Sequence, residues 1–151
     1  MLDAGKGAIT DALLRHGISP QALLAIETNP VRHQLLQRRF PQAHTACGDA
    51  CQLELLAKSS GAFSPEGADV GCTSFGLLTM PKSLQHNITA AAVSILRPAD
   101  VFVQYTYGPR HPLDDGVRER LSPHCRRFGL AWRNLPPARV YVYSRQASAG
   151  S

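Results

Sequence analysis

The chain has 151 residues, of which 44% are hydrophobic and 18% are charged, and its formal net charge is +5. This length and composition predict one folded domain with a hydrophobic core and exclude a disordered polyampholyte. No apolar run is long enough to cross a bilayer, we expect no secretory leader, and the cysteines and histidines lack the spacing of metal ligands. These features predict a cytoplasmic protein with reduced thiols. Its basic charge suits nucleic acid, an anionic membrane surface or an acidic ligand, or serves solubility alone.

The first part of the chain alternates helix and strand patterns. A helix is predicted over 8–16 and stops at Gly17, and the apolar run 22–27 predicts a buried strand that ends in an acid. Asn29 then caps a helix that opens at Pro30.

Five further segments follow before residue 100. We predict a short strand that begins near residue 43 and ends at Gly48–Asp49, a helical turn or two over 51–57, a loop over 59–67, a strand over 68–74 and the longest helix over 81–96.

The last third of the chain is richer in strands. Residues 101–107 form the strongest strand pattern, and a loop is predicted over 108–116. Two strands near 127–133 and 138–143 precede a tail, 146–151, that we expect to be disordered. This order predicts an α/β protein with a three-layer, mostly parallel sheet closed by a C-terminal antiparallel hairpin.

Ligands of open parallel sheets bind at the carboxyl ends of the strands, which here are Glu27, Asp49, Thr73 and residues 105–107. Glu27 lies 20 residues after Gly7, a spacing at which a carboxylate holds a ribose diol; the competing interpretation is an acid that caps the next helix. Asp49 suits an adenine amino group, or is simply a turn aspartate.

These residues carry a resemblance to a known family. “GKGAIT…LLAIETNP…GDA” is similar to the cofactor half of class I S-adenosylmethionine (SAM)-dependent methyltransferases. “TSFGLLTMP”, “LRPADVFVQYTYGPRHPL” and “WRNLPPARVYVYSR” resemble bacterial phospholipid N-methyltransferases, which are related to the rRNA adenine dimethyltransferases. The resemblance spans about residues 1–145 as one methyltransferase domain, truncated at its N-terminus, so the first strand of the Rossmann-like sheet is expected to be missing or incomplete.

The resemblance implies roles for individual residues. The residues implied to bind SAM are Gly5, Gly7, Glu27, Asp49, Ala50 and Thr73. Tyr105 and Tyr107 would be the catalytic residues beside the lipid headgroup, although alternating aromatic residues on a strand also suit a core. Arg110, Arg133 and Asn134 would bind the lipid substrate, and no metal is implied.

The resemblance implies methyl transfer from SAM to the amine of phosphatidylethanolamine or its methylated derivatives, at the inner face of the cytoplasmic membrane. Two alternatives remain open from the residues. One is a SAM methyltransferase that acts on rRNA or another substrate, although “TSFG” differs from the target-base motif of the rRNA enzymes and disfavours nucleic acid. The other is a basic domain without activity that binds membranes or a partner.

Overall fold

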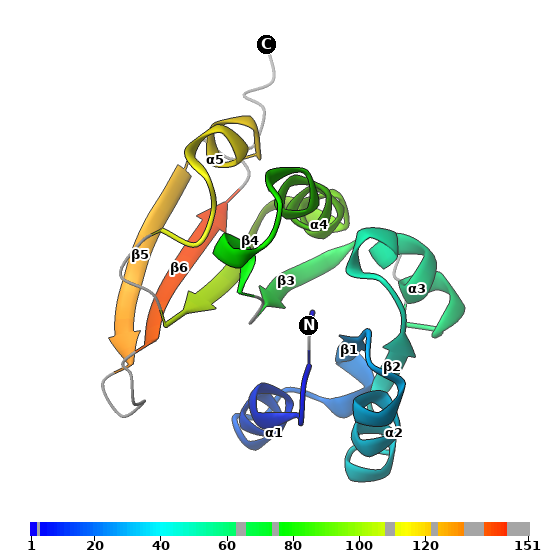
Figure 1. Ribbon diagram of the computed structural model, residues 1–151. Coiled ribbons are helices and arrows are strands. Elements are labelled where there is room, and N and C mark those ends of the chain that lie inside the picture. Colours follow the sequence, from blue (N-terminus) through cyan, green and yellow to red (C-terminus); the bar gives the residue numbers. More distant parts are fainter. Residues whose placement is uncertain are drawn as a thin grey trace. The chain divides into compact units, whose positions relative to one another are not determined.

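The computed structural model describes residues 1–2, 4–62, 66–73, 76–107, 111–121, 124–131 and 138–144 (Figure 1). The chain divides into two compact units, Met1–Pro65 and Glu66–Ser151, and each is described here by itself. The predicted single domain over 1–145 stays a prediction, and the tail 146–151 lies outside the described residues.

The first unit is built on two parallel strands, β1 (Leu24–Glu27) and β2 (His44–Cys47). The strands pair in register, so that Glu27 at the end of β1 lies opposite Cys47 at the end of β2. The helices of this unit are α1 (Ala8–Arg15), α2 (Pro30–Arg39) and α3 (Leu53–Ser59), and the 3-10 turns are η1 (Pro20–Ala22) and η2 (Ala50–Gln52). The alternation of helix and strand predicted for this half is therefore confirmed.

The chain's first residues run alongside β1. Leu2 forms a parallel bridge with Ile26, whose N–H donates to the Met1 carbonyl at 2.8 Å, while the Ala4 N–H donates to the Ile26 carbonyl at 3.1 Å. The expected first strand is thus incomplete but not absent. These few residues give the buried backbone of β1 the partners that it needs, and Leu2 and Ala4 are themselves buried.

The start of α2 follows the predicted cap. The Asn29 side chain accepts hydrogen bonds from the N–H groups of Val31, at 3.0 Å, and Arg32, at 3.1 Å, and Pro30 occupies the first helical position. Both features satisfy or remove donors that would otherwise lack partners at a helix start.

Replacing Asn29 with alanine is therefore expected to lower the free energy of unfolding by about 1 kcal/mol, because two N–H groups of α2 lose their acceptor. Urea denaturation measures the change. The matched control is Asn87→Ala, because Asn87 is exposed inside a helix and caps nothing. Equal denaturation midpoints for the two variants would contradict this role for Asn29.

The second unit contains a four-stranded sheet in the order β3-β4-β6-β5. The first pair is parallel, and β6 is antiparallel to both of its neighbours, so β4 and β5 run in the same direction (Figure 1). The strands are β3 (Ala68–Thr73), β4 (Leu96–Thr106), β5 (His124–Ala131) and β6 (Ala138–Ser144). The helical elements are α4 (Lys82–Ser94), α5 (Asp115–Leu121) and the turn η3 (Leu77–Thr79). The predicted C-terminal hairpin is β5–β6.

The strand boundaries of this unit differ from the prediction, and β5 spans His124–Ala131 rather than 127–133. Strand β4 begins at Leu96 rather than Val101 and includes Pro98. The pairing of β3 with β4 shifts between Ala68 and Val70, and such an irregularity tolerates a proline that cannot donate to the ladder.

Helix α5 lies partly in a segment predicted to be a loop. Its start is stabilised by Asp114, whose carbonyl accepts from the Arg118 N–H at 2.9 Å and whose Oδ1 accepts from the Gly116 N–H at 3.2 Å. The buried side chain of Gln85, on α4, accepts from the Asp114 N–H at 3.1 Å. This contact between distant parts of the chain outweighs the helix-breaking tendency of Gly116.

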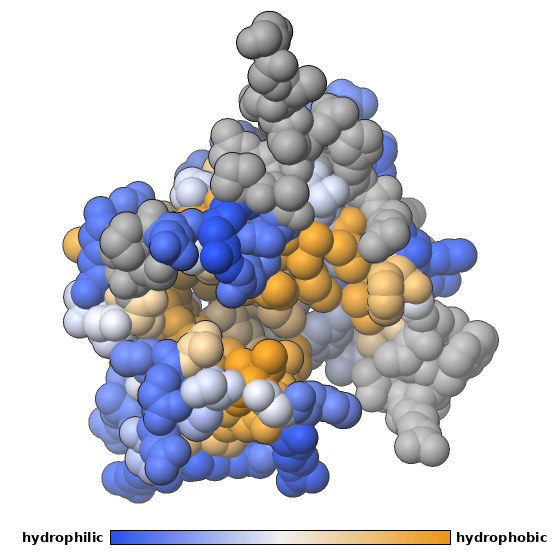
Figure 2. All heavy atoms as spheres, turned by 180° about the vertical axis from the view of Figure 1, so that it is seen from behind, coloured by the Kyte–Doolittle hydropathy of each residue, from blue (hydrophilic) through white to orange (hydrophobic). Residues whose placement is uncertain are grey.

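The core of the second unit lies around Phe102, which is fully buried and contacts the Tyr143 ring at a centroid distance of 6.0 Å. Within the described ranges, no helix is long and apolar enough to cross a membrane. Figure 2 shows hydrophilic residues over much of the face drawn, with hydrophobic residues exposed between them.

Candidate functional site

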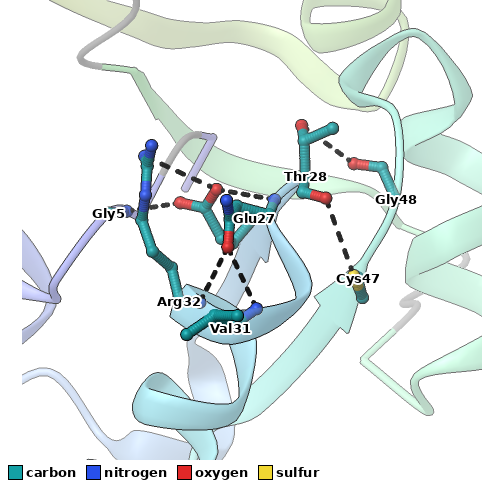
Figure 3. A network of polar contacts seen from close by, with 8 residues as sticks. Gly5, Glu27, Thr28, Val31, Arg32, Cys47 and Gly48 are labelled. Carbon is teal, nitrogen blue, oxygen red and sulfur yellow. Dashed lines mark hydrogen bonds and ion pairs between the residues drawn. The ribbon is translucent and has the colours of Figure 1, made fainter.

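The carboxyl ends of β1 and β2 carry a network of polar contacts around Glu27 (Figure 3). Only 2% of Glu27 is exposed. Its Oε2 accepts from the Gly5 N–H at 2.8 Å, and its Oε1 accepts from the Asn29 N–H at 2.9 Å. The carboxylate therefore joins the loop before α1 to the turn before α2. Asn29 caps that helix, so the cap role considered for Glu27 is filled by another residue.

Arg32 contributes to this network and was not foreseen from the sequence. Its Nη1 lies 3.7 Å from Oε1 of Glu27, and half of its side chain is exposed. A cation in the first turn of a helix is disfavoured by the helix dipole, and the Glu27 carboxylate offsets that cost. The unfavourable position of Arg32, directly after the Asn29–Pro30 start, was a signal in the sequence for an acidic partner.

The residues after β2 are tied to those after β1. The Gly48 N–H donates to the Glu27 carbonyl at 3.2 Å, and the Thr28 hydroxyl donates to the Gly48 carbonyl at 3.3 Å. Asp49 is exposed and acts as a turn residue, because its Oδ1 accepts from the Cys51 N–H at 2.9 Å. Burial and a hydrogen bond with Asp49 raise the pKa of the Cys51 thiol. Contact of Asp49 with an adenine stays a prediction.

Gly5 and Gly7 both have positive φ, at +56° and +83°, but they differ in their surroundings. A Cβ added at Gly7 would lie 2.4 Å from Cε2 of Phe40 and 3.0 Å from Cδ2 of Leu36, so Gly7 is needed for packing against α2. A Cβ added at Gly5 would meet no atom within 4 Å. Open space therefore lies beside Gly5. Ala50, in contrast, is a buried residue.

A second group of predicted residues lies at the carboxyl ends of β3 and β4. Thr73 is fully buried and pairs with Gln104, directly before Tyr105. The rings of Tyr105 and Tyr107 meet edge-on at 5.6 Å, and 51% of Tyr107 is exposed. The core interpretation therefore does not hold for Tyr107. These three residues, the predicted site residues of this unit that the structure describes, share one edge of the sheet.

Arg110, Arg133 and Asn134 lie outside the described residues, and their predicted contacts with the lipid stay predictions. His111 forms an unforeseen cluster, with ring centroids 4.6 Å from Tyr141 and 5.8 Å from Tyr143. Burial lowers the pKa of His111, which favours its neutral form. Because these residues belong to different segments of the chain, no local pattern predicted their meeting.

Several solved structures of other proteins have a fold similar to that of this chain. A TehB-like SAM-dependent methyltransferase from Corynebacterium glutamicum superposes with a TM-score of 0.67 at 16% identity, over 96% of this chain and 78% of that one. The N-methyltransferase NodS from Bradyrhizobium japonicum, solved with S-adenosylhomocysteine, gives 0.67 at 14% identity, over 97% and 76%. The fold is that of the class I methyltransferases.

A 16S rRNA methyltransferase from T. thermophilus, solved with AdoMet and guanosine, has the same fold, with a TM-score of 0.65 at 17% identity. The match covers 96% of this chain but 37% of that one. No protein-family model and no curated protein matches the sequence. The class I methyltransferase fold is therefore established at the level of architecture, and the solved neighbours act on different substrates.

Proposed function

We propose that this chain binds SAM at the carboxyl ends of β1 and β2 and transfers its methyl group to the amine of phosphatidylethanolamine or its methylated derivatives. The observation that carries the cofactor part is the buried Glu27 carboxylate beside the open backbone of Gly5. Solved neighbours that include SAM-dependent enzymes support it. The choice of acceptor rests on the resemblance of “VQYTYGPR” and “WRNLPPA” to phospholipid N-methyltransferases.

The residues present suit the ribose and methionine parts of this cofactor. An ionised carboxylate offers about four acceptor sites, and the described contacts of Glu27 are two N–H groups and the long contact with Arg32. A ribose hydroxyl would take the position of the half-exposed Arg32 side chain, and Gly5 would admit the methionine end. When bound, SAM supplies an electrophilic methyl group on a sulfonium.

The acceptor side uses Tyr105 and Tyr107. Methyl transfer is an in-line displacement, so the protein mainly holds the two reactants in position. The tyrosine hydroxyls would orient the amine, which must be neutral to attack, and the exposed aromatic face of Tyr107 would attract the cationic product.

Because the ribose would displace the Arg32 side chain from Glu27, substitution of Arg32 is expected to change the affinity for the cofactor. Arg32→Gln is expected to raise the affinity for S-adenosylhomocysteine about threefold, because it removes a partly exposed ion pair that the ligand must displace. Isothermal titration calorimetry measures this. Arg38→Gln, at an exposed site on the same helix, is the matched control and should leave the affinity unchanged. Weaker binding by Arg32→Gln would contradict displacement of Arg32 by the ribose.

The acceptor is tested separately by incorporation of labelled methyl from SAM into phosphatidylethanolamine vesicles and into rRNA. Incorporation into the lipid amine alone supports the proposed acceptor. Incorporation into rRNA alone would reject the lipid and keep the SAM site. Absence of SAM binding by calorimetry would reject the methyltransferase proposal as a whole.

A further inference from the structure

The positive charge of this protein is concentrated in its C-terminal segment. Residues 121–151 contain five arginines and no acidic residue, whereas the rest of the chain has eleven basic and eleven acidic residues. The net charge of +5 therefore belongs to the last 31 residues, which include the β5–β6 hairpin. Such segregation along the chain favours a positive field around this segment, where Arg127 and Arg139 are the arginines whose side chains the structure describes.

An aromatic side chain projects from the same hairpin. Phe128 is 71% exposed on β5, a strand at the edge of its sheet. Arg127 pairs with Tyr141 and Gly129 with Val140, so Phe128 is the extra residue of a β-bulge. Bulges of this kind redirect a side chain and interrupt the ladder. The bulge therefore holds a large apolar group in solvent beside the exposed Arg127.

The register of the sheet places this bulge near the proposed acceptor site. Gly129 on β5 and Tyr105 on β4 both pair with Val140 of β6, and β4 and β5 run in the same direction (Figure 1). Arg139 lies between Thr106 and Leu130 in the next row. The carboxyl edge of this sheet thus combines exposed Phe128 and Tyr107 with arginines. We call Arg127, Phe128, Arg139 and Tyr107 the basic edge.

We propose that the basic edge docks on an anionic phospholipid bilayer, with Phe128 entering the headgroup region and the arginines contacting lipid phosphates. This goes beyond methyl transfer, because docking requires neither SAM nor an amine acceptor. The positive charge of Arg127 and Arg139 complements an anionic leaflet. The bulge and Arg127 hinder the addition of a strand from a second copy, as charges and bulges do at exposed sheet edges.

The test is co-sedimentation of the full chain with vesicles of phosphatidylglycerol and phosphatidylcholine, and with vesicles of phosphatidylcholine alone. We expect binding to the anionic vesicles only. Arg127→Glu should weaken it at least about fivefold, and Phe128→Ser should weaken it about tenfold by removing buried apolar area. Phe128→Leu should restore most of the binding.

Two control variants match these changes in the other unit. Leu55→Ser removes an apolar side chain that is 62% exposed, and Arg38→Glu reverses an exposed charge. Both should bind vesicles nearly as well as the unsubstituted chain, and circular dichroism checks that all variants fold. Equal losses in test and control variants, or tighter binding to a single-stranded RNA oligonucleotide than to vesicles, would overturn the proposal. Vesicle binding without SAM binding would support docking while rejecting methyl transfer.

Discussion

Replacing Glu27 with alanine is expected to lower the free energy of unfolding by about 3 kcal/mol, because it leaves the N–H groups of Gly5 and Asn29 without their acceptor. The site is almost closed to solvent, since 2% of Glu27 is exposed. The hydrogen bond from the Gly5 N–H, at 2.8 Å, spans 22 positions of the chain, and the one from the Asn29 N–H, at 2.9 Å, fixes the turn directly after β1. Their loss therefore loosens both the first residues and the turn before α2.

Urea denaturation measures this effect, and Glu54→Ala is the matched control. Glu54 is an exposed glutamate of α3 that pairs with Lys58, and exposed pairs of this kind contribute about 0.5 kcal/mol or less. Equal losses of stability in the two variants would show that the Glu27 side chain does not hold the loop before α1 to the turn before α2.

The same residue provides a test of cofactor binding that does not depend on stability. Glu27→Gln keeps one acceptor oxygen for a backbone N–H and removes the charge, so more of the folded state should survive. Its affinity for S-adenosylhomocysteine should fall at least about tenfold if the carboxylate holds the ribose, since hydrogen bonds to charged groups contribute about 1.5–3 kcal/mol. An unchanged affinity in calorimetry would remove Glu27 from the cofactor site.

The two glycines before α1 are expected to lose different amounts of stability when replaced with alanine. Gly7→Ala should cost about 3 kcal/mol of stability, because a positive φ disfavours a side chain and the new Cβ would collide with Phe40. Gly5→Ala meets open space and should cost only about 1 kcal/mol, from its φ alone. Thermal denaturation should therefore rank Gly7→Ala well below Gly5→Ala.

Gly5→Ala is expected to affect cofactor binding more than it affects stability. Gly5→Ala puts a methyl group into the space proposed for SAM and is expected to lower its affinity about tenfold with a small loss of stability, through a clash of the kind that overpacking creates. Gly17→Ala is the control, because Gly17 also has positive φ and open surroundings but lies after α1. Equal affinities for these two variants would place the cofactor away from Gly5.

Much of the secondary structure follows from local signals in the sequence. The Asn29–Pro30 start of α2, the short apolar runs of β1 and β3, and the closing hairpin were predicted because each depends on neighbouring residues. The start of β4 was predicted too late and α5 was not predicted, because Pro98 and Gly116 are strong breakers by themselves. A shifted strand pairing and a hydrogen bond from the Asp114 N–H to the Gln85 side chain decided those two elements.

Some features of the candidate site could likewise be predicted from the sequence, and others depend on tertiary contacts. The sequence indicated Glu27, Asp49 and Thr73 at strand ends, since polar residues after apolar runs are visible without coordinates. The contact of Arg32 with Glu27 could be suspected from the helix dipole. In contrast, the need for glycine at position 7 comes from the ring of Phe40, which lies far along the chain. The His111 cluster likewise brings a loop residue together with residues of β6. Neither contact is visible in the sequence.

The sequence by itself determined the alternation of helices and strands, the polar residues at the strand ends and the concentration of arginines after residue 121. These properties depend on periodicity, caps and composition, which act over a few residues. The tertiary structure decided which glycine faces open space, which partners hold Glu27 and where the bulge exposes Phe128. Those outcomes depend on the register between strands and on side chains packed from distant segments, and neither is encoded by any single stretch of the chain.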